Sequence, residues 1–480
     1  MKEISVLSVD LGAESGRVNS VHLANGQISL RNLHRFPNQP VRVGDALHWN
    51  ILSLWQEIKN GIAKGSPLSP ASIGIDTWGV DFALLDDQDH LIGNPVHYRD
   101  RRTDGMMESV LERLPKEEIF QETGIQFMQI NTLYQLFSMV SGNPSMLRAA
   151  KTFLTIPDLL NFWLTGEKAC EYSNATTTQL FNPLSFSWSD RILTELEIPE
   201  SIFPQIISPG TRLGEYEKLP VIAPACHDTG SAVAAIPAED ENYIYISSGT
   251  WSLVGVEIDT PIMTSAALQA NLTNEGGVNN TIRFLKNVMG LWIIQQCRSQ
   301  FEADGNAYDY ESLIKLADSA RPFQHFINPD DSKFFHPGNH PAFIREYCKN
   351  TGQAIPETEG AVVRCALECL AFAYRKVIDD ILRISGRQAS CVHIVGGGSR
   401  NRLLCQMTAD ATGRPVVAGP VEATVLGNAL AQFMALGEIE SISEGRRMIA
   451  GLPEITRYYP KNSGNWQAGY EQFLKYCNRH

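Results

Sequence analysis

Two short turns rich in glycine and hydroxyl residues are the part of this sequence best suited to bind phosphate. They are DLGAESGR (10–17) and SSGTWS (247–252), and each lies between two apolar segments. Consecutive small residues in a tight turn expose backbone N–H groups, which bind phosphate oxygens without a lysine. Asp10 could hold Mg²⁺ against those oxygens, directly or through water, and Arg17 could add a guanidinium contact. Together the turns suggest that a triphosphate is bound from two sides.

A third segment, VIAPACHDTGSAVAA (221–235), could supply an acid–base group. We expect a strand that runs to Cys226 and a helix of small residues after it. One interpretation makes Asp228 or Thr229 only the N-cap of that helix, which contributes about 1 kcal/mol. The other makes Asp228 a general base that the helix N-terminus keeps ionised, because phosphoryl transfer needs a positioned acceptor that takes the hydroxyl proton late. The residues alone leave both interpretations open.

The run GGGSRN (396–401) resembles a dinucleotide-binding fingerprint, but Asn401 stands where the last glycine should be. It predicts a glycine-rich turn between a strand and a helix. Either the backbone of this turn meets a nucleotide, or the turn is purely structural. The sequence contains no G-x-x-x-x-G-K-[ST], H-E-x-x-H or G-x-S-x-G, so we expect no P-loop, zincin helix or nucleophile elbow.

His336 and His340 are four residues apart, which on a helix would be the spacing of two metal ligands. Pro337 and Gly338 lie between them and are incompatible with that helix. We therefore expect a solvent-exposed loop within 321–341, a stretch rich in Pro, Asn and Asp, and no metal site.

Charge and composition exclude several classes of protein. The chain has 40 Lys and Arg against 53 Asp and Glu, a net charge of −13 that argues against nucleic-acid binding. With 480 residues, 43% of them hydrophobic and 19% charged, it is typical of a globular protein of more than one domain. The first residues lack the apolar core of a signal peptide, and no run is long enough to span a membrane. Nine cysteines without a C-x-x-C pair predict reduced, buried thiols in a cytoplasmic protein whose partners are small molecules.

The elements that must position these residues follow an α/β pattern. We expect strand–turn–strand units at 4–23, 72–93 and 243–258, with Gly12 and Gly249 at the same place in the first and third. The other predicted elements are a helix at 49–65 ending on Gly65, helices at 361–385 (stopped by Gly386), 400–412 and 422–437, and strands at 391–398 and 414–420. This order predicts a mixed sheet in each of two lobes. Chance similarity between two common hairpins is the alternative to a duplication.

Taken together, these segments resemble the FGGY carbohydrate kinases, whose fold is the two-lobe, actin-like ATPase. The matching segments are VDLGAESGR (9–17), IDTWGVDFALLD (75–86), YRDRRT (98–103), NTLYQL (131–136), EYSNATTTQL (171–180), HDT (227–229), SSGTWSL (247–253), NEGG (274–277), LKNVMGLW (285–292), HIVGGGS (393–399) and AGPVEATVLGN (418–428). The resemblance implies duplicated ribonuclease H-like domains with an active-site cleft between them. It implies an N-terminal FGGY domain over 1–240, with the sugar site and first phosphate turn, and a C-terminal FGGY domain over 241–480, with the second phosphate turn and the adenosine site.

The resemblance also implies a reaction. Mg-ATP would phosphorylate the 1-hydroxyl of L-rhamnulose, a sugar that IDTWGVDF (75–82) and LKNVMGLW (285–292) indicate within the family, and Asp228 would be the catalytic base. The implied sugar-binding residues are Gly79, His227, Asp228, Thr229 and Asn287. The implied ATP-binding residues are Ala13, Glu14, Ser15, Gly16, Arg17, Thr250, Gln295, Gly396, Gly397 and Gly398, and Asp10 is expected near the metal.

Several features leave alternatives open. Trp78 either adds an apolar wall to the sugar pocket or packs in the core, and NATTT (174–178) either lines that pocket or forms a hydroxyl-rich turn. Cys226 stands where the resemblance leads us to expect serine, and could make the site sensitive to oxidants. Another ketose, such as L-fuculose or L-ribulose, is the alternative substrate. A nucleotide-switched protein of the actin or chaperone type is the alternative class, although those proteins have an aspartate where Ser247 and Ser248 stand.

Overall fold

The computed structural model describes residues 3–461 and 463–477 and contains two compact units. Unit 1 comprises residues 1–239, 257–285 and 423–451, and unit 2 comprises 240–256, 286–422 and 452–480. The chain passes from one unit to the other several times, so the units are not its two halves. The boundary between family domains at residue 240 stays a prediction.

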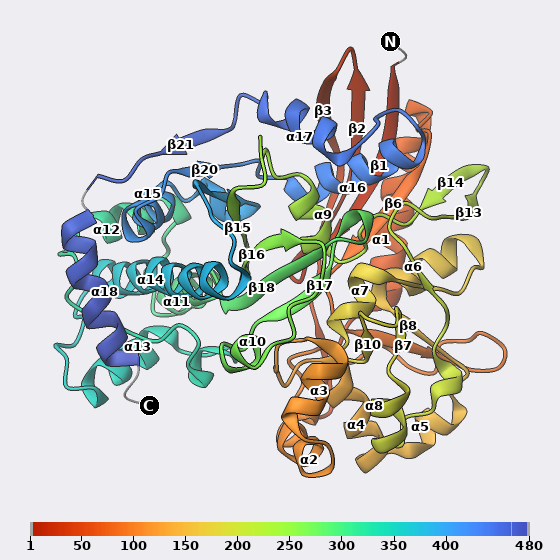
Figure 1. Cartoon of the computed structure of the whole chain (residues 1–480), viewed down its shortest axis with the longest axis horizontal. Coiled ribbons are helices and arrows are strands. Elements are labelled where there is room, and N and C mark those ends of the chain that lie inside the picture. The colour runs from red at the N-terminus through yellow and green to blue at the C-terminus, as the bar shows by residue number, and fades with distance from the viewer. Residues whose placement is uncertain (1–2, 462, 478–480) are drawn as a thin grey trace. The chain divides into compact units, whose positions relative to one another are not determined.

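Unit 1 is built on a six-stranded mixed sheet (Figure 1). Its order is β13 (Arg212–Tyr216), β14 (Leu219–Ile222), β6 (Ile73–Thr77), β1 (Ile4–Leu11), β2 (Ser15–Ala24) and β3 (Gln27–Pro37). β1 is antiparallel to β2 and parallel to β6, β6 is parallel to β14, and β13 and β14 are antiparallel. The predicted hairpin at 4–23 is therefore confirmed, and its strands β1 and β2 lie side by side next to the edge strand β3.

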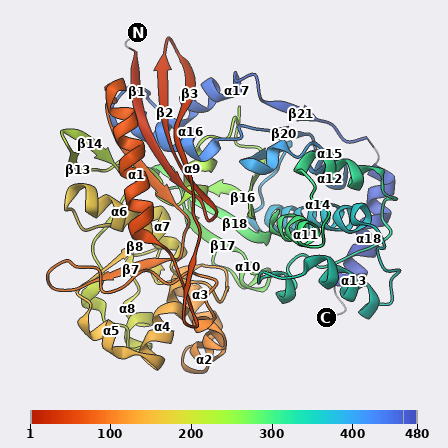
Figure 2. The same cartoon turned by 180° about the vertical axis from the view of Figure 1, so that it is seen from behind.

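Helices cover both faces of this sheet. Figures 1 and 2 show α1 (Ile51–Gly65) on one face and α16 (Ala423–Ala435) on the other. Glycines permit the close approach, because a Cβ at Gly61 of α1 would lie 2.3 Å from Val18 and one at Gly74 of β6 would lie 2.6 Å from Asn428. The short helix α9 (Asp228–Ala234) packs on α16, where a Cβ at Gly427 would lie 1.7 Å from the carbonyl oxygen of Ser231.

Within segment 72–93 the two predicted strands are present, but they do not pair with each other. β6 joins the main sheet, while β7 (Phe82–Leu85) pairs antiparallel with β8 (Thr152–Thr155). One local prediction for unit 1 is wrong. Gly65 is not a left-handed C-cap: its φ is −84°, and the chain continues into a 3₁₀ turn at Ser66–Leu68 before Ser69 adopts φ 49°. The apolar sequence of β7 predicted a buried strand, but it did not predict which strand β7 pairs with.

The remaining elements of unit 1 surround the sheet. They are β4 (Val41–Val43), β5 (Ala46–His48), α2 (Met106–Arg113), α3 (Lys116–Thr123), α4 (Thr132–Gly142), α5 (Pro144–Ala149), α6 (Ile156–Thr165), β9 (Cys170–Glu171), α7 (Tyr172–Thr177), β10 (Phe181–Asn182), β11 (Ser187–Trp188), α8 (Asp190–Glu195), β12 (Ile206–Ile207), α10 (Ser265–Gln269), β17 (Thr273–Gly276) and α17 (Ile442–Ala450).

A second mixed sheet has the order β17, β18 (Ile282–Met289), β16 (Trp251–Ile258), β15 (Tyr243–Ser248), β19 (Cys391–Val395), β20 (Val416–Ala418) and β21 (Thr456–Tyr458). β15, β19, β20 and β21 belong to unit 2, and β17 belongs to unit 1. β15 is antiparallel to β16 and parallel to β19, β19 is parallel to β20, and β20 is antiparallel to β21. These orientations repeat those of β1, β2, β6, β14 and β13, which agrees with the predicted duplication.

The helices of unit 2 are α11 (Trp292–Ala303), α12 (Tyr310–Ser319), α13 (His340–Asn350), α14 (Glu359–Ser385), α15 (Arg402–Thr412) and α18 (Ser463–Cys477). The long helix α14 ends at Gly386 in the left-handed conformation, with φ 69°, as predicted. The prediction of an exposed loop is wrong at His340, which is the first residue of α13 and fully buried against Trp292 and Phe334.

The described residues contain no cluster of three or more His, Cys, Asp or Glu side chains placed to hold a metal ion. None of their helices combines the length and the apolar character needed to cross a membrane. Seven of the nine cysteines are buried.

Candidate active site

Three carboxylates of unit 1 lie where two neighbouring strands end and a helix begins. Asp10 on β1 is in register with Asp76 on β6, and Thr77 at the end of β6 forms an isolated bridge with His227. Asp228 follows as the first residue of α9. Burial, and then the charge of Asp10, raise the pKa of both Asp76 and Asp228, as expected for like charges that lie close together.

The carboxyl group of Asp228 is placed for proton transfer. His227 is the N-cap of α9, so the interpretation of Asp228 or Thr229 as the N-cap is wrong. One oxygen of Asp228 accepts hydrogen bonds from the N–H of Thr229 at 2.6 Å and from its hydroxyl at 3.2 Å. Burial and Asp10 outweigh these bonds and raise the pKa of Asp228 to about 7, although its side chain is 27% exposed. Near neutral pH the carboxyl group is therefore partly ionised and can accept a proton and release it again. The effect of the helix N-terminus on its ionisation stays a prediction.

Arg17 lies opposite Asp10 in the register of β1 and β2. Its Nε and Nη2 atoms each lie 2.8 Å from Oδ2 of Asp10, so the guanidinium forms an ion pair with that carboxylate. The N–H of Gly12 donates to the carbonyl oxygen of Ser15 at 3.0 Å and closes the turn between the strands. Residues 12–14 form the tight turn, and Ser15, Gly16 and Arg17 are the first residues of β2. The contact of residues 13–17 with phosphate stays a prediction.

His227 is surrounded by charged side chains. Its Nδ1 atom lies 3.0 Å from Nη2 of Arg283 and 3.5 Å from Oε2 of Glu275, and its Nε2 atom lies 3.5 Å from Oδ1 of Asp228. Burial, and then the charge of Arg283, hold the pKa of His227 well below its usual range. The imidazole is therefore neutral at neutral pH.

A strained turn places Gly79 beside α7. The N–H of Asp81 donates to the carbonyl oxygen of Gly79 at 3.0 Å, which makes a γ-turn centred on Val80 with φ 68°. This φ is unfavourable for a β-branched residue. Two hydrogen bonds hold it: the Val80 N–H donates to Oγ1 of Thr177 at 3.0 Å, and Oγ1 of Thr132 donates to the Val80 carbonyl oxygen at 2.6 Å. The hydroxyl-rich run 174–178 therefore supports this turn.

Trp78 packs in the core. Its side chain is 5% exposed, its ring centre lies 4.0 Å from that of Trp49, and its Nε1–H donates to Oδ2 of Asp81 at 3.0 Å. Trp49 donates to the same oxygen at 2.6 Å. Of the two interpretations of Trp78, core packing is the one the structure supports.

In unit 2 the predicted nucleotide residues gather at the turn between β15 and β16. A Cβ at Gly398 would lie 2.0 Å from Oγ of Ser248, and Gly396 adopts φ 82° with its Cα beside the Ser248 carbonyl oxygen. The carbonyl oxygen of Thr250 accepts from the N–H groups of Gly290 at 3.2 Å and Trp292 at 3.3 Å. Three chain segments thus meet at one turn, where Gly249 and Gly397 are exposed and Ser248 and Gly398 are buried.

Asn287 and Gln295 complete the predicted set in unit 2. Asn287 lies on β18, and Gln295 lies in the first turn of α11, where its N–H donates to the carbonyl oxygen of Leu291 at 2.9 Å. The predicted residues therefore fall into two groups. Unit 1 contains Asp10, residues 13–17, Gly79 and residues 227–229, and unit 2 contains Thr250, Asn287, Gln295 and residues 396–398.

Comparisons with known proteins decide the family. The profile of the FGGY family of carbohydrate kinases, N-terminal domain, matches residues 5–221, and that of the C-terminal domain matches residues 244–436. The chain belongs to the FGGY family of carbohydrate kinases. It is a sugar kinase with the predicted two-domain fold of the actin-like ATPase class.

Relatives and solved structures agree with this assignment. The rhamnulokinase of Bacteroides thetaiotaomicron is 43% identical, over 98% of this chain and 99% of that protein. The rhamnulokinase of Halalkalibacterium halodurans is 44% identical, over 94% and 98%. The fold is also similar to that of ligand-bound xylulose kinase from Lactobacillus acidophilus, with TM-score 0.80, 14% identity and coverage of 99% and 98%. Plasmodium falciparum glycerol kinase with ADP gives TM-score 0.78 at 14% identity, with the same coverage.

Three charged residues of this FGGY kinase were not selected in the sequence. They are Asp76, Glu275 and Arg283, which are 0%, 4% and 0% exposed. Asp76 and Arg283 interrupt apolar strands, in IGIDT and IRFLKNVM. A charged residue inside a buried strand is costly unless it has a partner, and this signal could have identified both.

Cys226 differs from its predicted behaviour. It is fully buried, and burial raises the pKa of its thiol well above the usual value. Its N–H donates to Oε2 of Glu171 at 2.9 Å, and this carboxylate also accepts from the Ser173 hydroxyl at 2.5 Å. A buried protonated thiol is unreactive, so the structure does not support an oxidant-sensitive site.

Asp10 and Asp76 fit a Mg²⁺ ion bound largely through water and phosphate. Burial, and then repulsion from Asp10, raise the pKa of Asp76, whose Oδ1 has no hydrogen-bond partner among the described residues. A cation nearby would offset this repulsion. Mg²⁺ usually keeps several waters and takes one or two carboxylates plus substrate phosphates, so a cluster of three protein ligands is not required.

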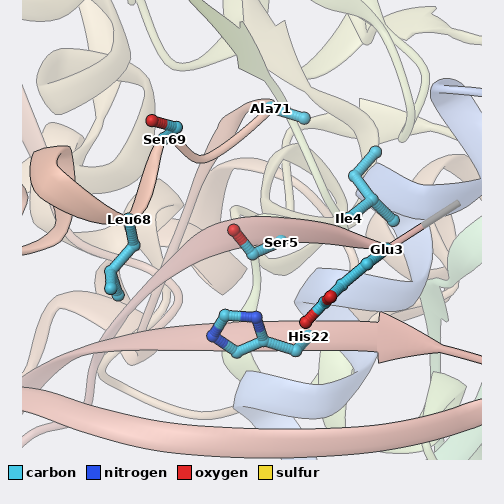
Figure 3. A pocket seen from close by; sticks show the side chains of 7 residues that line it. All are labelled: Glu3, Ile4, Ser5, His22, Leu68, Ser69 and Ala71. Atoms are coloured by element: carbon cyan, nitrogen blue, oxygen red, sulfur yellow. The ribbon is translucent and has the colours of Figure 1, made fainter.

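A separate pocket of about 460 Å³ lies at the opposite end of β1 from Asp10 (Figure 3). Its lining includes Glu3, Ser5 and His22. None of the predicted site residues belongs to it, so we do not connect it with the kinase reaction.

Proposed function

We propose that this FGGY kinase transfers the γ-phosphate of ATP to the 1-hydroxyl of L-rhamnulose, giving L-rhamnulose 1-phosphate and ADP. Several relatives at 43–44% identity over nearly the whole chain are rhamnulokinases, which supports this sugar. The observation that carries the proposed mechanism is the carboxyl group of Asp228, whose pKa of about 7 suits proton transfer at neutral pH. ATP is available in the cytoplasm, where we expect the reaction to occur.

Asp228 is the proposed base. Its carboxylate accepts the proton of the sugar hydroxyl as the bond to phosphorus forms, because an alcohol becomes acidic only late in a loose phosphoryl transfer. His227, Thr229, Gly79 and Asn287 are the proposed sugar-binding residues, and they orient the hydroxyl for attack. Such positioning contributes several kcal/mol to catalysis without any covalent chemistry by the protein.

Backbone groups are proposed to hold the nucleotide. The proposed ATP-binding residues are residues 13–17, Thr250, Gln295 and Gly396–Gly398, and neutral N–H groups would supply much of the attraction for phosphate. Asp10 is the proposed residue nearest to Mg²⁺. When bound, the ion neutralises charge that develops on the transferred group and the leaving oxygen.

A coupled assay of ADP release tests the proposed function. L-rhamnulose, L-fuculose and L-ribulose are supplied separately, with a sample that contains ATP and no sugar. We expect the highest kcat/KM with L-rhamnulose and a product phosphorylated at the 1-hydroxyl by mass spectrometry and phosphorus NMR. Absence of turnover with L-rhamnulose while another ketose reacts well would overturn the substrate, and ATP hydrolysis unaffected by every sugar would overturn the kinase reaction.

A further inference from the structure

The β17–β18 hairpin contributes a buried ion pair to the surroundings of His227. Glu275 on β17 and Arg283 on β18 are direct partners in the antiparallel register, and their charged atoms lie 3.3 Å apart. Arg283 is 0% exposed and Glu275 is 4% exposed. Removing a charged group from water costs several kcal/mol per ion. A buried pair such as this one is therefore expected to have a further polar partner.

That partner is His227. Nη2 of Arg283 lies 3.0 Å from Nδ1 of His227, and Nε of Arg283 donates to the carbonyl oxygen of Gly276 at 2.7 Å. The second bond fixes the plane of the guanidinium, and the carboxylate of Glu275 balances its charge. The side chain therefore has little freedom to rotate away from the imidazole.

The chemistry of the guanidinium determines the tautomer of His227. A guanidinium has only donors and remains protonated, so the Nδ1 atom 3.0 Å from it is placed to accept. Oε2 of Glu275, which could accept a proton from Nδ1, lies farther from it, at 3.5 Å. Because the ring is neutral, its single proton is then on Nε2, the nitrogen that lies 3.5 Å from Oδ1 of Asp228. An imidazole without this partner could carry the proton on either nitrogen.

We propose that Arg283 is a positioning residue, which fixes His227 in the Nε2–H tautomer and thereby makes it a hydrogen-bond donor to the sugar beside the base Asp228. This inference rests on the proposed function, since it needs the sugar to bind at His227. The donor selects a sugar that presents an oxygen acceptor next to the hydroxyl to be phosphorylated. Glu275 holds Arg283 and acts through it.

The tautomer can be measured directly in the unmodified protein. Ring nitrogen-15 NMR of the full chain labelled at histidine, with His227 identified by the signal lost in His227→Gln, distinguishes an acceptor nitrogen from an N–H. We expect Nδ1 of His227 to be unprotonated and Nε2 protonated at neutral pH, before sugar is added. A proton on Nδ1 would overturn the proposal, whichever sugar proves to be the substrate.

Variants of Arg283 test the consequence for the reaction. Arg283→Met keeps the length of the side chain and removes its charge and donors, whereas Arg283→Lys keeps one charge and a donor. For the best sugar of the panel, Arg283→Met should lower kcat/KM about ten-fold, the loss expected for one uncharged hydrogen bond, with the KM for ATP changed less than about two-fold. It should also lose the fixed tautomer, and Arg283→Lys should recover part of both.

The controls separate positioning from folding. Arg212→Met removes an exposed arginine of the same unit, 59% exposed and paired with Glu215, and should change neither measurement. If Arg283→Met does not fold, Glu275→Gln is the second test. This variant keeps the guanidinium of Arg283 and removes the carboxylate that balances its charge. It should broaden the NMR signals of His227 and raise the KM for sugar. Unchanged tautomer and kcat/KM in a folded variant of either residue would overturn the proposal, while failure of the sugar panel alone would overturn only the proposed function.

Discussion

The two sheets repeat one pattern of strand orientation but end in opposite kinds of side chain. In unit 1, Asp10 lies two residues before the turn glycine Gly12, and it is in register with Asp76 on the next parallel strand. In unit 2, Ser247 lies two residues before Gly249, and it is in register with Val395. The charged positions of the first sheet are thus neutral in the second.

The helix that follows the next strand but one shows the same contrast. The chain beyond β14 begins α9 with Asp228, whereas the chain beyond β20, the strand at the equivalent place in the second sheet, begins α16 with Ala423. The run of three glycines at 396–398 follows β19, which is the equivalent of β6. Carboxylates can exchange protons and attract a cation, and exposed N–H groups can bind an anion without adding charge. One topology therefore provides two chemistries, because strand ends fix positions and leave the residue type open.

The largest effect is expected from removal of the proposed base, Asp228. Asp228→Asn keeps an oxygen that can accept from Thr229 but cannot take a proton at the hydroxyl. We expect kcat to fall by roughly 10²- to 10⁴-fold, with little change in the KM for ATP, in steady-state kinetics. Asp190→Asn is the matched control, because Asp190 is also the first residue of a helix in unit 1 and should leave kcat unchanged. A fully active Asp228→Asn enzyme would exclude Asp228 as the base.

A single added methyl group tests the role of the uncharged glycine run at 396–398. A Cβ at Gly398 would lie 2.0 Å from the Ser248 side chain, whereas one at Gly397 has no heavy atom within 4 Å. Gly398→Ala should cost about 1–3 kcal/mol of stability and raise the KM for ATP, because Ser248 and its turn must shift. Thermal unfolding of Gly397→Ala should match the wild type, so this variant separates packing from direct contact with nucleotide. Equal unfolding temperatures for both alanine variants would show that the turn adapts without cost.

The smallest expected effect is a shift in pH dependence. Only the deprotonated carboxylate of Asp228 can act as base, so kcat/KM should fall as the pH is lowered through about 7. The negative charge of Asp10 raises the pKa of Asp228, after burial, so Asp10→Asn should move this acidic limb to lower pH. The measurement compares the midpoint pH of the acidic limb and not the maximal rate, because loss of a metal contact would lower the rate at every pH. Asp87→Asn, an exposed change in the same unit, should leave the limb where it is, and a limb moved to higher pH would contradict the coupling.

Local patterns predicted the parts of the fold that neighbouring residues determine. The hairpins around Gly12 and Gly249 and the end of α14 at Gly386 follow from turn residues between apolar runs, and they are confirmed. The pairing of β7 with β8 was missed because nothing in either strand encodes a partner about seventy residues away, an error typical of non-local pairing.

Candidate site residues that belong to a local motif were predicted. Residues whose partners come from distant strands were missed. Asp228 stood out because it follows a strand and begins a helix. The pKa of about 7 was not predictable, because it arises from burial and from Asp10, more than two hundred residues earlier. Arg283 and Glu275 acquire meaning only when the β17–β18 register places them beside His227.

The position of α16 in the chain has a consequence for biosynthesis. Gln432 of this helix donates to the carbonyl oxygen of Leu7 and accepts from the hydroxyl of Ser72, and Asn428 donates to Asp76. The central strands of unit 1 therefore have buried partners that are translated late. Leu7 and Gln432 are 425 residues apart, which at about 5–20 residues per second is roughly 20–90 s on the ribosome. The nascent first sheet must wait that long with one face uncovered, and a chain truncated before residue 423 would never cover it.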